Sequence, residues 1–208
     1  MTEVETLGAV ARGSSSSKAW LRALELTAPI ARNRDRIFPA IVDERAAAAP
    51  EAPALLSARE CLSYGALAKR VDQYARWALD QSLAKGDTVC LLMPNRPEYI
   101  AVWLGVTKVG AVVALLNTNL TGKSLAHCID VAGPKHIIVD AKLLDALDSA
   151  LAELRGGAKV WVHGSHPGAL PRIDQHINQH SQEPLRETER RQVTIADLAL
   201  YIDRKSVV

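Results

Sequence analysis

The stretch TVCLLMPNRPEYIAVWLGVTKVGAVVALL, residues 88–116, decides the fold. Its first six residues, 88–93, form a continuous apolar run of strand length. Pro97 then begins a helix over 97–108, which is apolar on almost every face and ends before Gly110. A second apolar strand follows over 111–116. Two fully apolar strands joined by one helix predict a β-α-β unit whose strands are parallel and covered on both faces.

The same alternation continues toward the C-terminus. A helix begins after Thr121, the expected N-cap, carries Leu125, Ile129 and Val131 on its apolar side, and closes at Gly133-Pro134. A strand over 136–140, a helix over 141–155 and a strand over 159–163 come next. We therefore predict an α/β fold with a mainly parallel sheet and helices on both faces. Residues 164–192 are polar and aperiodic, which predicts a long surface loop, and a last strand is expected over 198–202.

The sequence before residue 88 predicts helices and one hairpin. Residues 1–17 are polar and serine-rich, and we expect a disordered tail there. A short amphipathic helix over 18–31 is expected to dock onto the rest of the domain, and peripheral contact with a membrane surface is the alternative. A helix over 38–48, a hairpin over 54–63 with its turn near residues 58–60, and a long helix capped by Ser63 complete this part.

Composition narrows the class of protein. The chain has 208 residues, 48% of them hydrophobic, which is enough for one large domain with a buried core. Its net charge of +2 gives no general attraction to nucleic acid. The three cysteines are far apart and form no C-x-x-C pair. The N-terminus lacks a signal-peptide pattern, and the longest apolar run, 109–116, is too short to span a bilayer. We therefore expect a cytoplasmic protein.

One tripeptide imitates a phosphate-binding loop. Gly122-Lys123-Ser124 follows a buried strand, and the next strand ends in Asp140. A true loop of this kind needs glycine five residues before Gly122, so that the backbone can wrap around phosphates, but that position is Asn117. We interpret the tripeptide as an ordinary helix start with an exposed Lys123. A nucleotide hydrolase that uses Lys123 is the weakest of the alternatives.

Histidines offer two further candidate sites. His163, His166, His176 and His180 have spacings that suit zinc, yet their segment has no cysteine, little helical pattern and no apolar shell. We therefore expect no metal there. His127 lies beside Cys128 on a helix, and we interpret it as a packed or surface residue rather than half of a catalytic dyad. The residues alone assign no catalytic, cofactor-binding or metal-ligating residue.

A family resemblance lies between residues 61 and 139. The pattern comprises Leu62-Ser63-Tyr64-Gly65, Lys85-Gly86-Asp87, Met93-Pro94-Asn95-Arg96-Pro97-Glu98-Tyr99, Lys108-Val109-Gly110-Ala111 and Leu116-Asn117-Thr118-Asn119-Leu120-Thr121. In order and spacing it resembles the start of the adenylate-forming superfamily of acyl-CoA synthetases, luciferases and peptide-synthetase adenylation domains. The stretch 116–129 resembles the fatty-acid transport protein branch, whose members are long- and very-long-chain acyl-CoA synthetases.

The resemblance implies an activity for an intact enzyme. A fatty acid and Mg-ATP would give an acyl-adenylate, from which CoA displaces AMP. In the family, a Ser/Thr/Gly-rich loop that ends in Pro-Lys follows a strand like 197–202 and holds ATP, whereas this chain continues with Asp203-Arg204-Lys205-Ser206-Val207-Val208. No family catalytic residue can be carried onto this sequence. We therefore expect 18–202 to be a partial N-terminal domain, 203–208 an aberrant or foreign tail, and the truncated chain to be inactive.

Two consequences follow from that interpretation. A cut sheet would leave apolar surface and a strand edge uncovered, so we expect the chain to self-associate, with 198–202 ordered by a neighbouring copy or else disordered. A free-standing, non-catalytic binding or interaction module is the alternative of a different class.

Overall fold

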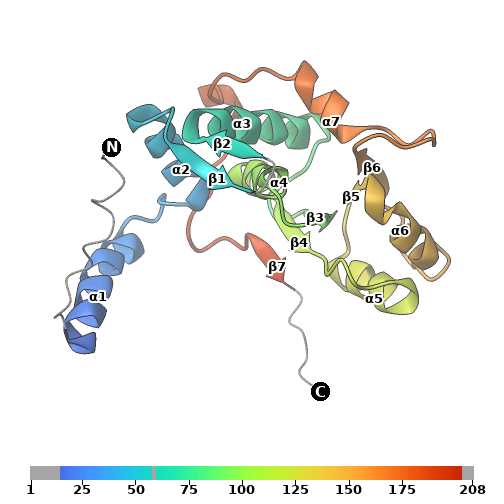
Figure 1. Ribbon diagram of the computed structural model, residues 1–208, viewed down its shortest axis with the longest axis horizontal. Coiled ribbons are helices and arrows are strands. Elements are labelled where there is room, and N and C mark those ends of the chain that lie inside the picture. The colour runs from blue at the N-terminus through green and yellow to red at the C-terminus, as the bar shows by residue number, and fades with distance from the viewer. Residues whose placement is uncertain (1–14, 58–59, 203–208) are drawn as a thin grey trace, which may run out of the picture.

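A five-stranded parallel sheet lies at the centre of the computed structural model, which describes residues 15–57 and 60–202. Its strands stand in the order β6-β5-β3-β4-β7 (Figure 1). They are β3 Thr88–Leu92, β4 Val112–Leu115, β5 His136–Asp140, β6 Lys159–His163 and β7 Leu200–Ile202. All four neighbouring pairs are parallel, so the strands expected around 88–93, 111–116 and 136–140 share one sheet. The α/β prediction is confirmed.

The central strand β3 shows why both faces of the sheet are covered. Every residue of β3 is buried, and successive side chains point to opposite faces. Val89 and Leu91 join one hydrophobic cluster, and Cys90 and Leu92 join another. The continuous apolar run therefore supplies two cores at once, one on each side of the sheet.

The larger core lies under three helices, α2 Phe38–Ala48, α3 Tyr64–Asp80 and α4 Pro97–Lys108. Ser63 caps α3 as expected, because its hydroxyl oxygen accepts a hydrogen bond of 3.2 Å from the Ala66 N–H. Trp77 and Tyr74 of α3 are fully buried. Helix α4 approaches α3 closely at Gly105, where a Cβ atom would lie 2.4 Å from the Tyr74 Cβ. The absence of a side chain at Gly105 sets how near these two helices can come.

The second core lies under α5 Gly122–Ala132 and α6 Leu144–Leu151, with a 3-10 turn at Ala141–Leu143 before α6. Gly133 ends α5 with a φ of +55°, as expected of a C-terminal glycine. Two details of the prediction are wrong. Thr121 occupies the N-cap position, but its side chain makes no capping hydrogen bond. Val131 is 74% exposed, because it lies two residues beyond the buried Ile129 and therefore on the opposite side of the helix.

The expected hairpin is an antiparallel pair, β1 Pro53–Leu56 and β2 Cys61–Ser63, next to α3. Residues 58–59 of its turn lie outside the described residues. The pair forms a separate two-stranded sheet and adds nothing to the central one.

Residues 164–192, here called the strap, run over the surface as their polar sequence predicts, but three buried residues and short helical turns tie them to the domain. The strap contains α7 Ile173–His176 and 3-10 turns at Ile177–Gln179 and Glu187–Glu189. Ile173, Ile177 and Leu185 within it are 3% exposed or less and belong to the larger core. In Figure 1 the strap, orange to red, crosses above α3. These three apolar residues anchor the strap among polar neighbours, and only Ile173 and Ile177, four residues apart, show a helical spacing.

Helix α1 Ser16–Arg32 contradicts the expectation of docking. It begins at Ser16, so residues 16–17 belong to the helix, and residues 1–14 of the expected tail lie outside the described residues. Figure 1 shows α1 projecting away from the sheet. Its apolar side chains stay in solvent, with Trp20 69% and Leu26 67% exposed. An amphipathic pattern identifies the apolar face of a helix but not the surface that packs against it.

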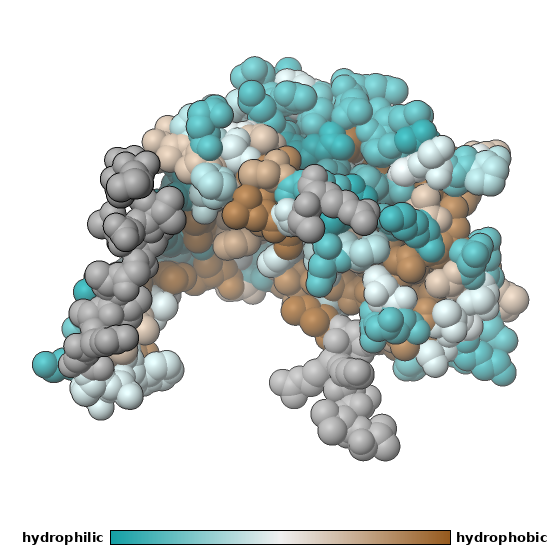
Figure 2. Space-filling model, in the orientation of Figure 1, coloured by the Kyte–Doolittle hydropathy of each residue, from teal (hydrophilic) through white to brown (hydrophobic). Residues whose placement is uncertain are grey.

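Strand β7 also differs from its expectation. It pairs with β4 of its own chain, with Leu200 opposite Val113, and so needs no neighbouring copy to become ordered. It forms one edge of the sheet and leaves Tyr201 46% and Ile202 69% exposed. Figure 2 shows apolar side chains on the underside of the molecule between α1 and the sheet, beneath a hydrophilic upper rim. Residues 203–208 lie outside the described residues, and no described helix is long and apolar enough to cross a membrane.

Candidate functional site

The carboxyl ends of β3, β5 and β6 meet at one edge of the sheet, where open parallel sheets commonly bind ligands. Asp140 and His163 end their strands there, and Arg96 precedes α4 just after β3. An open groove of about 770 Å³ lies along this edge. Its polar lining includes Glu60, Arg70, Arg96, Glu98, His163 and Asp174. The groove is therefore the first candidate for a ligand site.

Glu98 is the centre of the polar contacts in this groove. Its carboxylate accepts a hydrogen bond of 2.9 Å from Arg70 Nε and another from the Tyr74 hydroxyl. His163 Nε2 lies 3.7 Å from the same carboxylate oxygen. Arg70 in turn donates to Asn178 of the strap at 2.7 Å. Sequence reasoning gave Glu98 no role beyond the family motif, because its partners come from distant segments.

The pKa values in the groove favour a fixed ion-pair network. Burial alone would raise the pKa of Glu98, but nearby His163, the charge of Arg70 and the hydrogen bond from the Tyr74 hydroxyl lower it below its usual value. Burial, and then the charge of Glu98, raises the pKa of Tyr74 well above its usual value. Glu98 therefore stays ionised and Tyr74 stays protonated at neutral pH. Neither group exchanges protons readily, so the pair suits positioning rather than acid–base catalysis.

The tripeptide that imitates a phosphate loop does not form one. The Gly122 N–H donates to the Ser149 hydroxyl at 2.9 Å, so α6 already uses a backbone donor that a phosphate would need. β3 stands between β4 and β5, which separates the segment after β4 from Asp140. Asp140 instead caps the turn after β5 by accepting a hydrogen bond from the Lys142 N–H. Lys123 is exposed, as interpreted from the sequence.

His127 is exposed, and Cys90 is a buried thiol rather than a nucleophile. His127 lies with Lys123 and Arg155 along a second open groove, of about 910 Å³, between α5 and residues 153–158. Burial, and then neighbouring Cys128, raises the pKa of the Cys90 thiol to about 12. A thiol with so high a pKa is not a thiolate at neutral pH.

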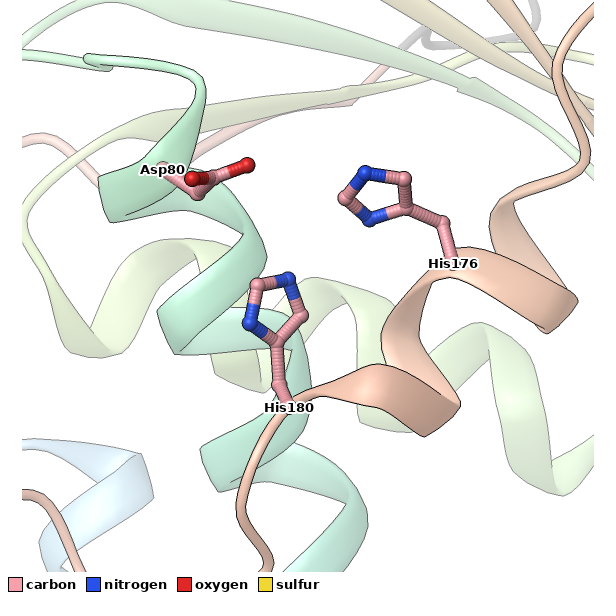
Figure 3. A group of neighbouring side chains, drawn as sticks. All are labelled: Asp80, His176 and His180. Atoms are coloured by element: carbon pink, nitrogen blue, oxygen red, sulfur yellow. The ribbon is translucent and has the colours of Figure 1, made fainter.

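Of the four histidines, only His176 and His180 join a cluster of possible metal ligands among the described residues, and His163 and His166 are not part of it. His163 contacts Glu98 at the carboxyl edge. His176 and His180 instead meet Asp80, the last residue of α3, as Figure 3 shows. The segment has little helical structure, as expected, since α7 has only four residues. The expected lack of an apolar shell is wrong at His176, because the Trp161 ring lies 5.0 Å from its ring. Asp80 could not be predicted as a partner of the histidines, because it lies far from them along the chain.

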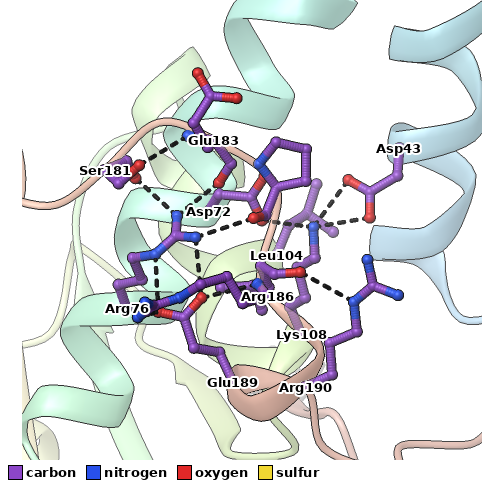
Figure 4. A network of polar contacts seen from close by, with 12 residues as sticks. Asp43, Asp72, Arg76, Leu104, Lys108, Ser181, Glu183, Arg186, Glu189 and Arg190 are labelled. Atoms are coloured by element: carbon purple, nitrogen blue, oxygen red, sulfur yellow. Dashed lines mark hydrogen bonds and ion pairs between the residues drawn. The ribbon is translucent and has the colours of Figure 1, made fainter.

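Arg76 of α3 is the main polar anchor of the strap (Figure 4). Its guanidinium donates to the backbone oxygens of Ser181, Glu183 and Pro184 at 2.8, 2.6 and 3.0 Å. It also forms an ion pair of 3.1 Å with Glu189. Nearby, Lys108 of α4 pairs with Asp72 and with Asp43 of α2. These contacts connect α2, α3, α4 and the strap into one polar network beside the larger core.

Known proteins match both the sequence and this fold. The family model described as AMP-binding enzyme matches residues 42–202. Long-chain fatty acid transport protein 6 of Homo sapiens is 34% identical over 155 residues, which cover 74% of this chain and 25% of that protein. The alignment with the crystal structure of the anthranilate CoA ligase AuaEII covers 76% of this chain and 31% of the AuaEII chain, with a TM-score of 0.67 and 19% identity. The fatty acyl CoA synthetase of Mycobacterium tuberculosis covers 70% and 28%, with a TM-score of 0.61 and 23% identity.

These matches span only part of each relative. The chain covers about a quarter of the length of the human relative and less than a third of each of the two ligase structures. The structural likeness at this level of identity shows the fold, while the family match rests on the sequence.

Proposed function

Because the chain belongs to the AMP-binding enzyme family, we propose that it is part of the N-terminal domain of an ATP-dependent fatty-acyl-CoA ligase. The single observation that carries this proposal is the 34% identity over 155 residues to a long-chain fatty acid transport protein. The parent enzyme would convert a fatty acid, ATP and CoA into acyl-CoA, AMP and pyrophosphate, with Mg²⁺ accompanying ATP. Residues 18–202 would form the partial domain.

The proposed role of this chain within the enzyme is structural support. Its carboxyl-edge groove is lined mainly by ion pairs, such as Arg70 with Glu98 and Arg172 with Asp174, while Arg96 Nε and His163 Nδ1 are buried there without a hydrogen-bond partner. The helix start after β4 does not fit a nucleotide phosphate, since Ser149 takes the Gly122 N–H. We therefore propose no catalytic role for the described residues. The groove would serve as one wall of the substrate region, completed by residues of the longer enzyme.

The first prediction tests activity. The chain alone is expected to form no acyl-CoA from long-chain fatty acids, ATP and CoA. A fusion of its residues 1–202 to the following portion of human long-chain fatty acid transport protein 6 is expected to form acyl-CoA. The measurement is the yield of acyl-CoA by chromatography, with the intact human protein as the positive control.

Two outcomes would count against the proposal. Acyl-CoA formation by the chain alone would show that it carries a complete site. A folded fusion that stays inactive, beside an active human control, would favour the non-catalytic binding module, since the lobe would then fail to replace its counterpart.

The exposed apolar surface supports two further proposals. Strand β7 is a free edge with Tyr201 and Ile202 in solvent, and the apolar side of α1 is bare. We propose that the chain self-associates through this surface. For a cytoplasmic protein that handles fatty acids, we also propose peripheral membrane contact through residues 18–31, where Lys18 and Arg22 accompany Trp20 and Leu21.

The second prediction separates these two associations. Light scattering is expected to show oligomers in buffer, and Ile202→Lys is expected to reduce them because a charge protects a strand edge. Deletion of residues 15–32 is expected to abolish cosedimentation with vesicles of mixed neutral and anionic lipid. A monomer by light scattering contradicts the first proposal, and vesicle binding that survives the deletion contradicts the second.

A further inference from the structure

Asp80, His176 and His180 form a cluster whose geometry suits a metal ion. Asp80 ends α3, His176 ends α7, and His180 follows the 3-10 turn Ile177–Gln179. One potential ligand atom from each residue lies within 4.8 Å of the others. Figure 3 shows the two imidazole rings and the carboxylate converging on a common space between α3 and the strap. His180 is extended after the turn, and the turn brings its ring within 5.5 Å of the His176 ring.

Two ring nitrogens of the cluster are buried without a partner. His176 Nδ1 and His180 Nε2 have no contact with solvent and no hydrogen bond. Burial of a polar atom without a partner is costly, and such atoms are uncommon in folded proteins. A bound cation would satisfy the lone pairs of a neutral imidazole. His163 and His166 also have buried ring nitrogens without a partner, so the nearness of the three side chains is what singles out this cluster.

The surroundings resemble the outer shell of a metal site. Gln81 Nε2 donates to Asp80 Oδ2 at 3.0 Å, and Gln81 itself accepts a hydrogen bond of 3.0 Å from Lys159. Trp161 packs edge-on against His176. Gln73 donates to the backbone oxygens of Ile177 and His180, which fixes the turn between the histidines. Groups that orient metal ligands in this way increase the affinity of a metal site.

We propose that His176, His180 and Asp80 bind a divalent transition metal ion of the zinc type. Two imidazoles and one carboxylate favour such an ion over Mg²⁺ or Ca²⁺, which prefer oxygen ligands. Three protein ligands leave a fourth position for water or another small ligand. Ligand atoms around tetrahedral zinc lie roughly 3.3 Å apart, given bonds near 2.0 Å. The ligand atoms would therefore have to move closer than their present separations of up to 4.8 Å. The exposed Asp80 side chain can rotate toward the rings to do so.

The proposed site is separate from the carboxyl-edge groove. Lys159, which contacts Gln81 beside Asp80, is the first residue of β6, whereas His163 at the groove is the last. The metal would join the strap to the end of α3 at the amino end of that strand. The inference does not depend on the proposed ligase activity, and metal binding by the chain is measurable without any enzyme assay.

The experiment measures binding of Zn²⁺ and Co²⁺ to the metal-stripped chain. All proteins carry Cys61→Ser, because the exposed Cys61 thiol is a competing ligand. Calorimetry is expected to show one Zn²⁺ per chain. Co²⁺ is expected to quench tryptophan fluorescence, because Trp161 lies beside His176. His176→Gln, His180→Gln and Asp80→Asn are each expected to weaken Zn²⁺ affinity by at least about tenfold, the scale of effects around metal ligands.

Matched controls are His166→Gln in the same strap and His127→Gln on α5, both of which should retain Zn²⁺ affinity and quenching. Asp80→Asn alters an exposed side chain and therefore tests the site even where a histidine variant unfolds. No saturable Zn²⁺ binding, or binding that all three cluster variants retain, would overturn the proposal. Equal weakening by the two control variants would also overturn it, since the ion would then bind histidines in general.

Discussion

Replacement of Arg76 by alanine is expected to lower the free energy of unfolding by about 3–5 kcal/mol, the cost of removing one partner from a buried ion pair. The change would leave the backbone oxygens of Ser181, Glu183 and Pro184 without this donor, and Glu189 would keep only its contacts with Arg186. Arg76 is only 9% exposed, so water replaces the guanidinium poorly. The strap should detach first, because these contacts join it to α3. Urea unfolding followed by circular dichroism measures the loss.

Arg186→Ala is the matched control, because Arg186 also pairs with Glu189 but its side chain is 78% exposed. Its loss should cost about 0–1 kcal/mol, as for other exposed ion pairs. Hydrogen bonds from Arg186 and Arg76 lower the pKa of Glu189 to about 2. We assign most of the stability to Arg76, since water screens the exposed partner. Equal losses in the two variants would contradict this assignment.

The same pair sets a pH dependence whose sign follows from that pKa. A carboxyl group with a lowered folded pKa stabilises the protein when it is ionised. The contribution of Glu189 is therefore complete above its usual pKa near 4.5 and disappears as the pH falls toward 2. In the Arg76→Ala protein this part of the acid sensitivity should shrink. Comparison of unfolding midpoints across this pH range measures the difference.

Gly105→Ala is expected to lower the free energy of unfolding by about 3 kcal/mol, at the upper end of the usual cost of overpacking. The new Cβ would lie 2.4 Å from the Tyr74 Cβ and 2.7 Å from the Val71 backbone oxygen. Both atoms belong to the backbone of α3 or are fixed to it, so no flexible side-chain end can move aside. Alanine favours a helix over glycine by about 1 kcal/mol, which is too little to offset the overlap.

Gly156→Ala is the control for this prediction, because nothing lies within 4 Å of the position of its Cβ. Its effect should stay within about 0.5 kcal/mol, as for most surface substitutions. Thermal unfolding of both variants gives the comparison. A stable Gly105→Ala protein would show that α3 and α4 are farther apart than described.

The elements that the sequence predicted well share strong local signals. The run 88–116 combines two apolar strands with a helix that Pro97 begins and Gly110 follows, and each of these features acts within a few residues. The strap lacks such signals. Ile173, Ile177 and Leu185 are single apolar residues among polar ones, and their burial depends on α3 lying beneath them. Long-range packing of this kind leaves no periodic pattern in the sequence.

The candidate sites show the same limit. The spacing of His176 and His180 is visible in the sequence, but the approach of Asp80 results from the crossing of the strap over the end of α3. The contacts of Glu98 likewise come from Arg70, Tyr74 and His163, which lie on two other elements. For α1, the amphipathic pattern predicts the helix correctly, but its expected docking is wrong, because such a pattern does not identify what covers its apolar face.

The place of β7 in the sheet sets an order of events during synthesis. Its partner β4 ends at Leu115, and residues 116–199 intervene before β7 begins. A chain that emerges from the ribosome N-terminus first can pair β3 with β4 and β5 long before β7 exists. The outer edge of β4 therefore waits unpaired while those 84 residues are made. Contacts so distant in sequence form slowly, so this unpaired edge is exposed to aggregation and to chaperone binding during synthesis.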